Sequence, residues 1–345
     1  MNLLLISPHP GFGGASTANQ NIARSLKIAG HQVIYMDEYF PKEIGENIDI
    51  TIDYYPIHQN GIKKQIRTYK YLSSLKPDAI LLGMPIVGLI NIVILLIFRL
   101  RGVKIGCIFH SLSLSNSFKG KTIDFIISCF TIICSHLFMV SKYTLISWQK
   151  FWFIKFRKNS TFVIHNVIQN KEQKFHKRDH ENIRLGFVGR FSDEKQPVIF
   201  CELAKHYHNK NIKFVAFGDG PLFEECNNKY ANYVDFHGYC NDMDIIYNSI
   251  DILLSTSKFE NCPMIILEAA RYGIPTIAPN VGGIPEIIQP GENGELYVNY
   301  DMNEIRDKID KIINNYQYYS EKALDFIKLY TAEKKAHEWN NALNK

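Results

Sequence analysis

The 345-residue sequence contains no C-x-x-C pair and no pair of histidines at the spacing of a structural zinc site. Its seven cysteines are an odd number within apolar segments, which is typical of reduced thiols and leaves no disulfide framework. Lysine and arginine exceed aspartate and glutamate by only five, far less than in a nucleic-acid-binding domain. The sequence therefore predicts an ordinary globular protein without metal or disulfide staples and without a nucleic-acid partner.

A targeting signal is also lacking. Leu3–Ile6 runs directly into a glycine loop without a charged region or a cleavage site, so we expect a cytoplasmic protein. Residues 79–98 are apolar and long enough to cross a bilayer, but Pro85 and Gly88 interrupt them. We expect a strand over 79–83 and a buried helix over 86–98, with a membrane span as the alternative.

Strand-like and helix-like segments alternate through the chain in two series. The first series runs from residue 2 to 164, and the second starts at residue 183 after a polar stretch over 171–182. This alternation predicts an α/β protein with parallel sheets and helical crossovers, and the length fits two domains. We expect an amino-terminal domain over 1–170, a carboxy-terminal domain over 171–316 and a final helical segment over 317–345.

A glycine-rich loop follows the first strand. Gly13 and Gly14 precede a helical pattern that stops at Gly30. Glycines at this place let a phosphate or a sugar approach the backbone, and the helix N-terminus offers N–H groups with a partial positive charge. A simple connecting turn is one alternative. A dinucleotide site is another because Asp37 follows the second strand, but Ser16 stands where that fingerprint needs its third glycine.

Two cations follow the first strand of the second series. Gly189 ends that strand, and Arg190 and Lys195 lie in the loop after it. Ligands bind at the carboxyl ends of parallel strands, and two cations there suit a diphosphate. After the next strand, Gly218 and Gly220 would let the backbone approach a flat base. Solvated loop charges and a tight turn are the alternatives.

Two glutamates eight residues apart give the strongest signal. Glu260 precedes a helix that we expect to begin at Pro263, and Glu268 lies inside that helix. The donor-binding candidates between them are Asn261, Cys262, Pro263, Met264 and Ile265. One carboxylate can accept hydroxyls of a sugar, the helix amides can hold a diphosphate, and the other carboxylate can accept ribose hydroxyls. Glu268 stands in an apolar run, where a carboxylate needs a partner, which weakens the alternative of an ordinary surface residue.

Together these residues resemble the retaining glycosyltransferases of family four (GT4). The E-x7-E motif from Glu260 to Glu268 and its continuation over 281–286 carry the resemblance, with further matches over 13–15, 30–33 and 163–166. The resemblance implies the GT-B fold, an α/β architecture of two Rossmann-like domains facing a cleft. Gln196 departs from the family, which commonly has glycine there.

The resemblance also implies a role for each candidate. Arg190 and Lys195 would bind the donor diphosphate, Glu260 the donor sugar and Glu268 the ribose. His110, at the end of a strand, would reach the transferred sugar from the amino-terminal domain, onto which the final helix would cross back. The catalytic candidates are His110, Glu260, Arg190 and Lys195.

The implied activity is retaining transfer of a hexosyl unit from a UDP-, GDP- or ADP-sugar to a glycan or lipid-linked glycan, in bacterial lipopolysaccharide or capsule assembly. Family members typically need no metal, so we interpret Asp242-Met243-Asp244 as a helix start and a divalent-ion motif as the alternative. A sugar-nucleotide epimerase of the same fold and a non-catalytic sugar-nucleotide-binding subunit are the alternative functions.

Bases alternate with aromatic residues from Lys150 to Lys158. Such a stretch can lie at an anionic membrane surface. With the apolar segment 122–133, it indicates a lipid-linked acceptor and a peripheral position on the inner face of the cell membrane. A helix packed on the core with its bases turned to solvent is the alternative.

Overall fold

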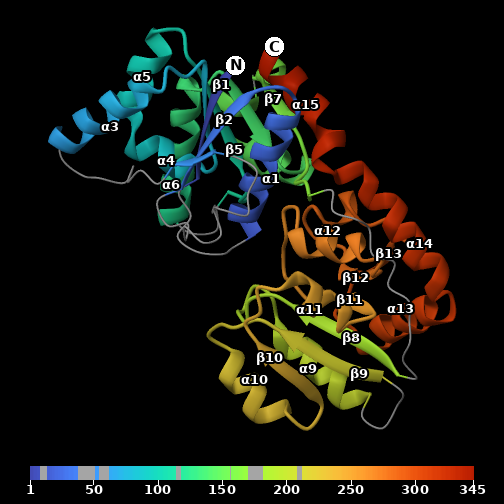
Figure 1. Ribbon diagram of the computed structural model, residues 1–345. Helices are drawn as coiled ribbons and strands as arrows, with labels where there is room; N and C mark the ends of the chain where they lie inside the picture. Colours follow the sequence, from blue (N-terminus) through green and yellow to red (C-terminus); the bar gives the residue numbers. More distant parts are fainter. Residues whose placement is uncertain are drawn as a thin grey trace. The chain divides into compact units, whose positions relative to one another are not determined.

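The computed structural model of the chain describes residues 1–7, 14–37, 51–53, 62–113, 118–155, 157–169, 182–207 and 212–345. The chain divides into two compact units (Figure 1). The first combines Met1–Gln169 with Thr331–Lys345, and the second comprises Asn170–Tyr330. The second division thus falls after residue 330, whereas the sequence analysis placed it after 316. Most of the polar junction over 171–182 lies outside the described residues.

A parallel seven-stranded sheet with the order β3-β2-β1-β4-β5-β6-β7 forms the centre of the first unit. Its strands are β1 (Asn2–Ser7), β2 (Gln32–Asp37), β3 (Thr51–Asp53), β4 (Ala79–Leu82), β5 (Lys104–Phe109), β6 (His136–Met139) and β7 (Thr161–Val163). Strands β4 and β6 are buried along their whole length, as expected where helices cover both faces of a parallel sheet. The first Rossmann-like domain is therefore confirmed.

Helices from both ends of the sequence cover this sheet. They are α1 (Gly14–Ile28), α3 (Ile62–Ser74), α4 (Pro85–Ile90), α5 (Ile92–Leu100), α6 (Phe118–Phe130), α7 (Lys142–Trp148), α8 (Trp152–Lys155) and α15 (Ala332–Asn344), with short 3-10 helices η1 (Thr131–Ile133) and η2 (Lys158–Ser160). The last helix, α15, packs along α1 (Figure 1). Its Trp339 ring lies 4.7 Å from the ring of Phe138 on β6, measured between centroids. This contact helps to fix the carboxy-terminal helix to the first unit.

The apolar segment over 79–98 forms β4 followed by two helices instead of the single helix expected. Helix α4 ends before Asn91, where the chain turns into α5. Gly88 is needed in α4 because a Cβ there would lie 2.0 Å from the Phe130 ring of α6. Among the described residues, no helix has both the length and the hydropathy to cross a membrane.

A parallel six-stranded sheet with the order β10-β9-β8-β11-β12-β13 forms the centre of the second unit. Its strands are β8 (Ile183–Val188), β9 (Ile212–Phe217), β10 (Val234–Gly238), β11 (Ile252–Leu254), β12 (Thr276–Pro279) and β13 (Gly294–Tyr297). Its helices are α9 (Pro197–His206), α10 (Phe223–Tyr230), α11 (Met243–Asn248), α12 (Met264–Arg271), α13 (Met302–Asn314) and α14 (Tyr316–Ile327), with 3-10 helices η3 (Ile284–Glu286) and η4 (Lys328–Tyr330). The second Rossmann-like domain is confirmed as well.

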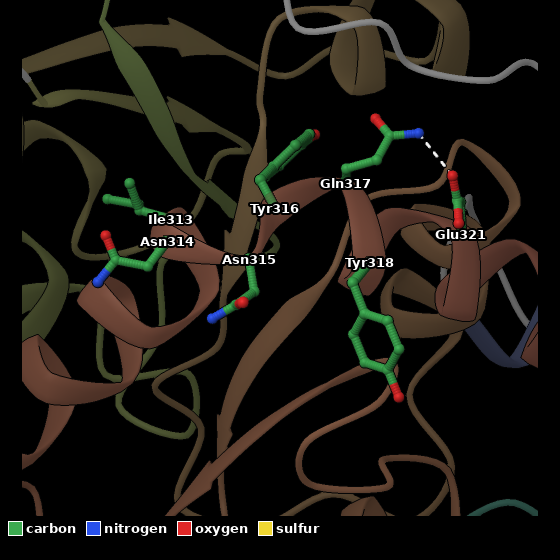
Figure 2. Close-up of a pocket in the computed structure, with 7 residues that line it drawn as sticks. All are labelled: Ile313, Asn314, Asn315, Tyr316, Gln317, Tyr318 and Glu321. Carbon is green, nitrogen blue, oxygen red and sulfur yellow. Dashed lines mark hydrogen bonds between the residues drawn. The ribbon is translucent and has the colours of Figure 1, made fainter.

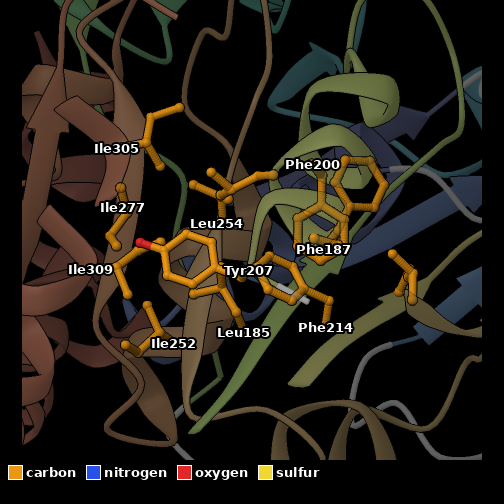
Figure 3. Close-up of a cluster of buried hydrophobic side chains, with 14 of the residues drawn as sticks. Leu185, Phe187, Phe200, Tyr207, Phe214, Ile252, Leu254, Ile277, Ile305 and Ile309 are labelled. Atoms are coloured by element: carbon orange, nitrogen blue, oxygen red, sulfur yellow. The ribbon is translucent and has the colours of Figure 1, made fainter. Parts of the chain in front are cut away.

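Aromatic rings fill the core of the second unit (Figure 3). The ring of Phe200 on α9 lies 5.6 Å from that of Phe187 on β8 and 5.3 Å from that of Phe214 on β9. Ile305 and Ile309 of α13 belong to the same buried cluster. Aromatic pairs at such separations add to the stabilisation that burial provides, so they fix β8 against its neighbours.

Both sheets reverse their strand order at their first strand. β1 lies between β2 and β4, and β8 lies between β9 and β11. In sheets of this topology, ligands bind beyond the carboxyl ends of the strands at the point of reversal. The loops after β1, β4 and β5 in one unit and after β8, β9 and β11 in the other are therefore the places to examine.

Candidate functional site

The loops after β8 and β9 are packed against each other through glycines. The Gly189 amide donates to the Phe217 carbonyl oxygen at 3.0 Å. Gly218 has a φ of +134°, and a Cβ on it would lie 1.9 Å from the Gly189 carbonyl oxygen. Gly220 has a φ of +151° and approaches the backbone of Phe191. The close approach of the two loops is thus a structural reason for these glycines, and it fixes the loop that carries Arg190.

Lys195 and Glu260 form an ion pair, although 65 residues separate them in sequence. Ser257, just after β11, donates its hydroxyl to Glu260 Oε1 at 2.9 Å. The Thr256 hydroxyl donates to the Lys195 carbonyl oxygen at 2.7 Å. The structure therefore brings the predicted cation and the first predicted carboxylate together at the carboxyl ends of β8 and β11.

The Glu260 backbone is supported from the loop after β12. The Gly283 amide donates to the Glu260 carbonyl oxygen at 2.9 Å. Gly282 has a φ of +61°, and a Cβ on it would lie 1.9 Å from the same oxygen. The glycine pair therefore allows the close approach that positions Glu260.

Glu268 lies on α12 and accepts a hydrogen bond from Tyr247 of α11, with 3.0 Å between the hydroxyl oxygen and Oε2. Burial raises the pKa of the Glu268 carboxyl, while the hydrogen bond from Tyr247 and the charge of Arg271 act in the opposite direction. The pKa of the buried Tyr247 phenol is raised by burial and by the neighbouring Glu268, so Tyr247 stays a hydrogen-bond donor. The expectation that Glu268 needs a partner is met by Tyr247.

The amino-terminal turn of α12 differs by one residue from the sequence prediction. The helix begins at Met264, and Pro263 is its extended N-cap residue, with a ψ of 122°. Pro263 has no N–H, so the first amides available at this end belong to Met264 and Ile265. The amide of Ile266 bonds to the Pro263 carbonyl oxygen. Of the two loop residues before Pro263, Cys262 is buried and Asn261 partly buried.

Arg190 extends from the loop after β8 and is exposed. Within the described ranges of the chain, its guanidinium has no ion-pair partner. A guanidinium in this condition keeps its donors for a ligand or for water.

The first unit has a polar cluster at the carboxyl ends of β1, β4 and β5. His110 Nε2 lies 2.9 Å from Asn19 Oδ1. The Asn19 amide nitrogen lies 3.2 Å from Ser7 Oγ and 3.4 Å from the Gly83 carbonyl oxygen. These two contacts orient the amide so that its oxygen faces His110, which makes Nε2 the donor of that pair. Gly14 begins α1, while Gly13 lies outside the described residues.

The sequence analysis missed Asn19, Thr256, Ser257 and Tyr247. Asn19 is fully buried within α1, and Tyr247 within α11. A polar side chain on the apolar face of a helix was the signal for Asn19, while the partners of Tyr247 come from a distant part of the chain. Only the folded arrangement shows that each holds a candidate residue in place.

Asp242 caps α11, because its carboxylate accepts the amides of Asp244 at 2.9 Å and Ile245 at 3.2 Å. Asp244 accepts a hydrogen bond from the Tyr272 hydroxyl at 2.6 Å. Both carboxylates of the D-x-D sequence thus have partners within the unit. In the part of the chain that the structure describes, no group of three or more His, Cys, Asp and Glu side chains is placed to hold a metal ion.

A shallow pocket of about 610 Å³ lies at the turn between α13 and α14 (Figure 2). It is lined by Ile313, Asn314, Asn315, Tyr316, Gln317, Tyr318 and Glu321. Glu321, its ionisable carboxylate, is bonded to the Gln317 amide at 2.6 Å. The pocket contains none of the candidate residues, so the candidate site is defined by the strand ends instead.

Comparison with known proteins identifies the carboxy-terminal half most directly. Residues 168–329 match the family of glycosyl transferases group 1. An uncharacterized glycosyltransferase of Methanocaldococcus jannaschii is 28% identical over 233 residues, which are 65% of this chain and 62% of that protein. The UDP-Gal:alpha-D-GlcNAc-diphosphoundecaprenol alpha-1,3-galactosyltransferase of Escherichia coli is 29% identical over 142 residues, 37% of each chain. The chain thus spans less than two thirds of the length of these relatives.

The likeness to solved structures covers the entire chain. Anabaena HepE in complex with UDP-glucose superimposes with a TM-score of 0.84 and 17% identity, over 100% of this chain and 99% of HepE. At that identity, the likeness shows the fold. The chain is a member of the group 1 glycosyltransferases (GT4), with the family's domain in residues 168–329 and the GT-B fold along its whole length.

Proposed function

We propose that the chain is a retaining glycosyltransferase that moves a hexosyl unit from a nucleoside-diphosphate sugar to a glycan or lipid-linked glycan in bacterial surface polysaccharide assembly. The observation that supports it most is the grouping at the carboxyl ends of β8 and β11. There the Lys195–Glu260 pair lies just before α12, the helix that carries Glu268. A cation, helix amides and two carboxylates in this order suit a sugar diphosphate on a nucleoside.

Each group has a proposed task toward the donor. Arg190, Lys195 and the amides at the start of α12 bind the diphosphate. Glu260, paired with Lys195 and bonded to Ser257, accepts hydroxyls of the transferred sugar. Glu268 accepts the ribose hydroxyls, and Tyr247 keeps its carboxylate in position through the bond to Oε2. Uridine is the favoured base, since HepE binds UDP-glucose and the E. coli relative uses UDP-Gal.

The transfer itself is proposed to occur on one face of the sugar. The bond from C1 to the diphosphate oxygen breaks, the acceptor oxygen bonds to C1 on the same face, and the acceptor proton passes to a phosphate oxygen. Arg190 and Lys195 stabilise the charge that develops on the departing diphosphate. We assign to His110 a contact with the transferred sugar, and to Asn19 the positioning of its ring.

Calorimetric melting with UDP-, GDP- and ADP-sugars, with and without EDTA, tests the donor site. A ligand that binds only the folded state raises the melting temperature, and we expect one sugar nucleotide to do so without a metal requirement. Glu268→Ala should abolish the shift because it removes the ribose acceptor. Glu225→Ala, on an exposed position of α10, is the matched control and should retain the shift.

Two outcomes would count against the proposal. A shift that Glu268→Ala retains would refute the assigned ribose contact, and the absence of a shift with every nucleotide would refute the donor site. Product analysis separates the alternative functions. An epimerase converts the donor in the absence of any acceptor, whereas a non-catalytic binder shows the shift and no turnover.

A further inference from the structure

Residues 79–169 carry a charge that the rest of the chain does not share. They contain ten of the 39 lysines and arginines but only one of the 34 acids, Asp124. Asp124 is buried within α6, so it does not lie among the surface cations. The rest of the chain has 29 bases and 33 acids by difference and is net negative. The positive charge of the protein is therefore concentrated in this segment.

Two of the ten cations have internal tasks. Lys104 Nζ donates to the Leu343 carbonyl oxygen at 2.6 Å. The Arg157 guanidinium donates to carbonyl oxygens at the end of η1, including that of Ser135 at 3.2 Å. The other eight are exposed. Those on or beside α5, α6 and α8 are Arg99, Arg101, Lys119, Lys121, Lys155 and Lys158.

The same helices expose large apolar side chains. On α5, Val93, Leu96 and Leu100 recur at one-turn spacing, with 65% of Val93 and 87% of Leu100 exposed. On α6 and η1, the exposed residues include Phe118, at 89%, Phe125 and Ile132. Helices α4, α5, α6 and α8 are linked by contacts with one another or with η1. We call these six apolar residues, with the six cations named above, the apolar-basic face.

The chemistry of this face favours one occupant. A second copy of the chain would bring the same cations together across a two-fold axis, which repels. A nucleic acid would use the cations but not the aliphatic side chains, because its contacts are to charge and to stacking aromatic rings. A bilayer with anionic headgroups uses both, since apolar residues enter the headgroup boundary and cations meet the lipid charge.

We propose that the apolar-basic face binds the surface of an anionic lipid bilayer. The assignment differs from the sequence hypothesis, in which the stretch from Lys150 to Lys158 supplied both the bases and the apolar contacts. Ile154 belongs to the core and Phe151 packs against it, and Arg157 turns inward, so this stretch supplies Lys155 and Lys158 only as flanking charge. The apolar contacts come from α5, α6 and η1 instead. The proposal does not depend on the transfer reaction.

Co-sedimentation with lipid vesicles tests the proposal. We expect the full chain to bind vesicles of phosphatidylcholine with phosphatidylglycerol, to bind pure phosphatidylcholine much less, and to dissociate as salt is raised. Each lysine near an anionic surface strengthens binding by about fivefold. Lys119→Glu/Lys121→Glu should therefore weaken binding by about 25-fold or more, and Val93→Glu/Leu100→Glu should weaken it as well.

Matched controls lie in the second unit. Val298, 66% exposed, and Lys213, also exposed, allow Val298→Glu and Lys213→Glu, which should bind vesicles like the unaltered chain. The tryptophans at 148, 152 and 339 all belong to the first unit, so their emission on unfolding shows whether each face variant remains folded. Because the substituted residues are exposed, we expect unchanged folding.

Three results would overturn the proposal. They are equal binding to neutral and anionic vesicles, full binding by both folded face variants, and a dimer that Val93→Glu/Leu100→Glu dissociates without any vesicle binding. The donor-induced melting shift is measured on the same preparations and should persist in every face variant. Lost vesicle binding with an intact shift counts against the face alone, whereas a missing shift in the unaltered chain counts against the proposed function alone.

Discussion

Gln196 lies in the left-handed region of backbone conformation, with a φ of 47° and a ψ of 53°, directly before Pro197 begins α9. A non-glycine residue in this region costs about 1–2 kcal/mol. The position is held by the Thr256 hydroxyl, which bonds the carbonyl oxygen of Gln196 at 3.0 Å and that of Lys195. The glycine that related sequences commonly have at this position therefore has a backbone explanation.

Gln196→Gly should raise the free energy of unfolding of the second unit by about 0.5–1 kcal/mol, because glycine adopts this conformation without the steric cost. Gln196→Ala removes the same side chain but keeps the strained conformation, so it should give no such gain. Calorimetry of both variants measures the difference. Equal stability of the two would show that the backbone at this position is not strained.

The residue types of the site could be predicted from sequence better than their pairings. Lys195 and Glu260 were predicted as separate donor contacts, and nothing in a separation of 65 residues indicates that they bond to each other. Arg157 was counted among surface bases, yet carbonyl oxygens that only the folded chain brings together turn it inward. Charge and spacing identify candidates, while packing decides which of them meet.

Helix α11 is short and depends on its ends. Asp242 caps it through the amides of Asp244 and Ile245, and near the other end Tyr247 reaches Glu268. The cap is worth about 1 kcal/mol. The stability of this one helix is therefore linked to the position of the carboxylate assigned to the ribose.

Asp242→Ala should lower the free energy of unfolding of the second unit by about 1 kcal/mol, whereas Asp242→Ser should retain most of it because serine also caps. Magnesium or manganese should not change the melting temperature of the unaltered chain. Calorimetry with each ion measures this. A stabilisation by the ion that Asp242→Ala abolishes would support the alternative of a divalent-ion motif.

Element types followed from periodicity, but two boundaries did not. The break at Asn91 depends on Gly88, whose reason is the Phe130 ring of another helix. The end of the second unit was placed before α14 because α13, α14 and α15 are consecutive polar-faced helices in sequence. The structure shows that α14 packs on α12, where Gly273 lets Ser320 approach. Both features arise from contacts between distant segments.

At the scale of the whole molecule, the two units differ in their response to acid. His136 of β6 is buried in the first unit, between the rings of Phe138 and Phe162. Burial, reinforced by the charges of Lys104, Arg157 and Arg99, lowers its pKa to about 4. Since the unfolded chain binds this proton more readily, the stabilisation is fully present above the ordinary pKa of about 6.5 and is lost as pH falls toward about 4.

The first unit should therefore lose up to about 3 kcal/mol of stability between these pH values through His136 alone. His136→Phe, which keeps a ring in the stack, should flatten this part of the pH dependence. Chemical denaturation followed by tryptophan emission measures it, because all three tryptophans lie in the first unit. An unchanged pH profile in the variant would assign the acid sensitivity to other groups.

The position of α15 has a consequence for how the chain is made. The second unit is contiguous from Asn170 to Tyr330, so a ribosome can deliver it whole while translation continues. The first unit, although it is synthesised first, lacks α15 and the Trp339 contact with Phe138 until residues 331–345 have emerged. The early part of the chain must then wait with the α1 side of its sheet uncovered, and the first unit is the last to be completed.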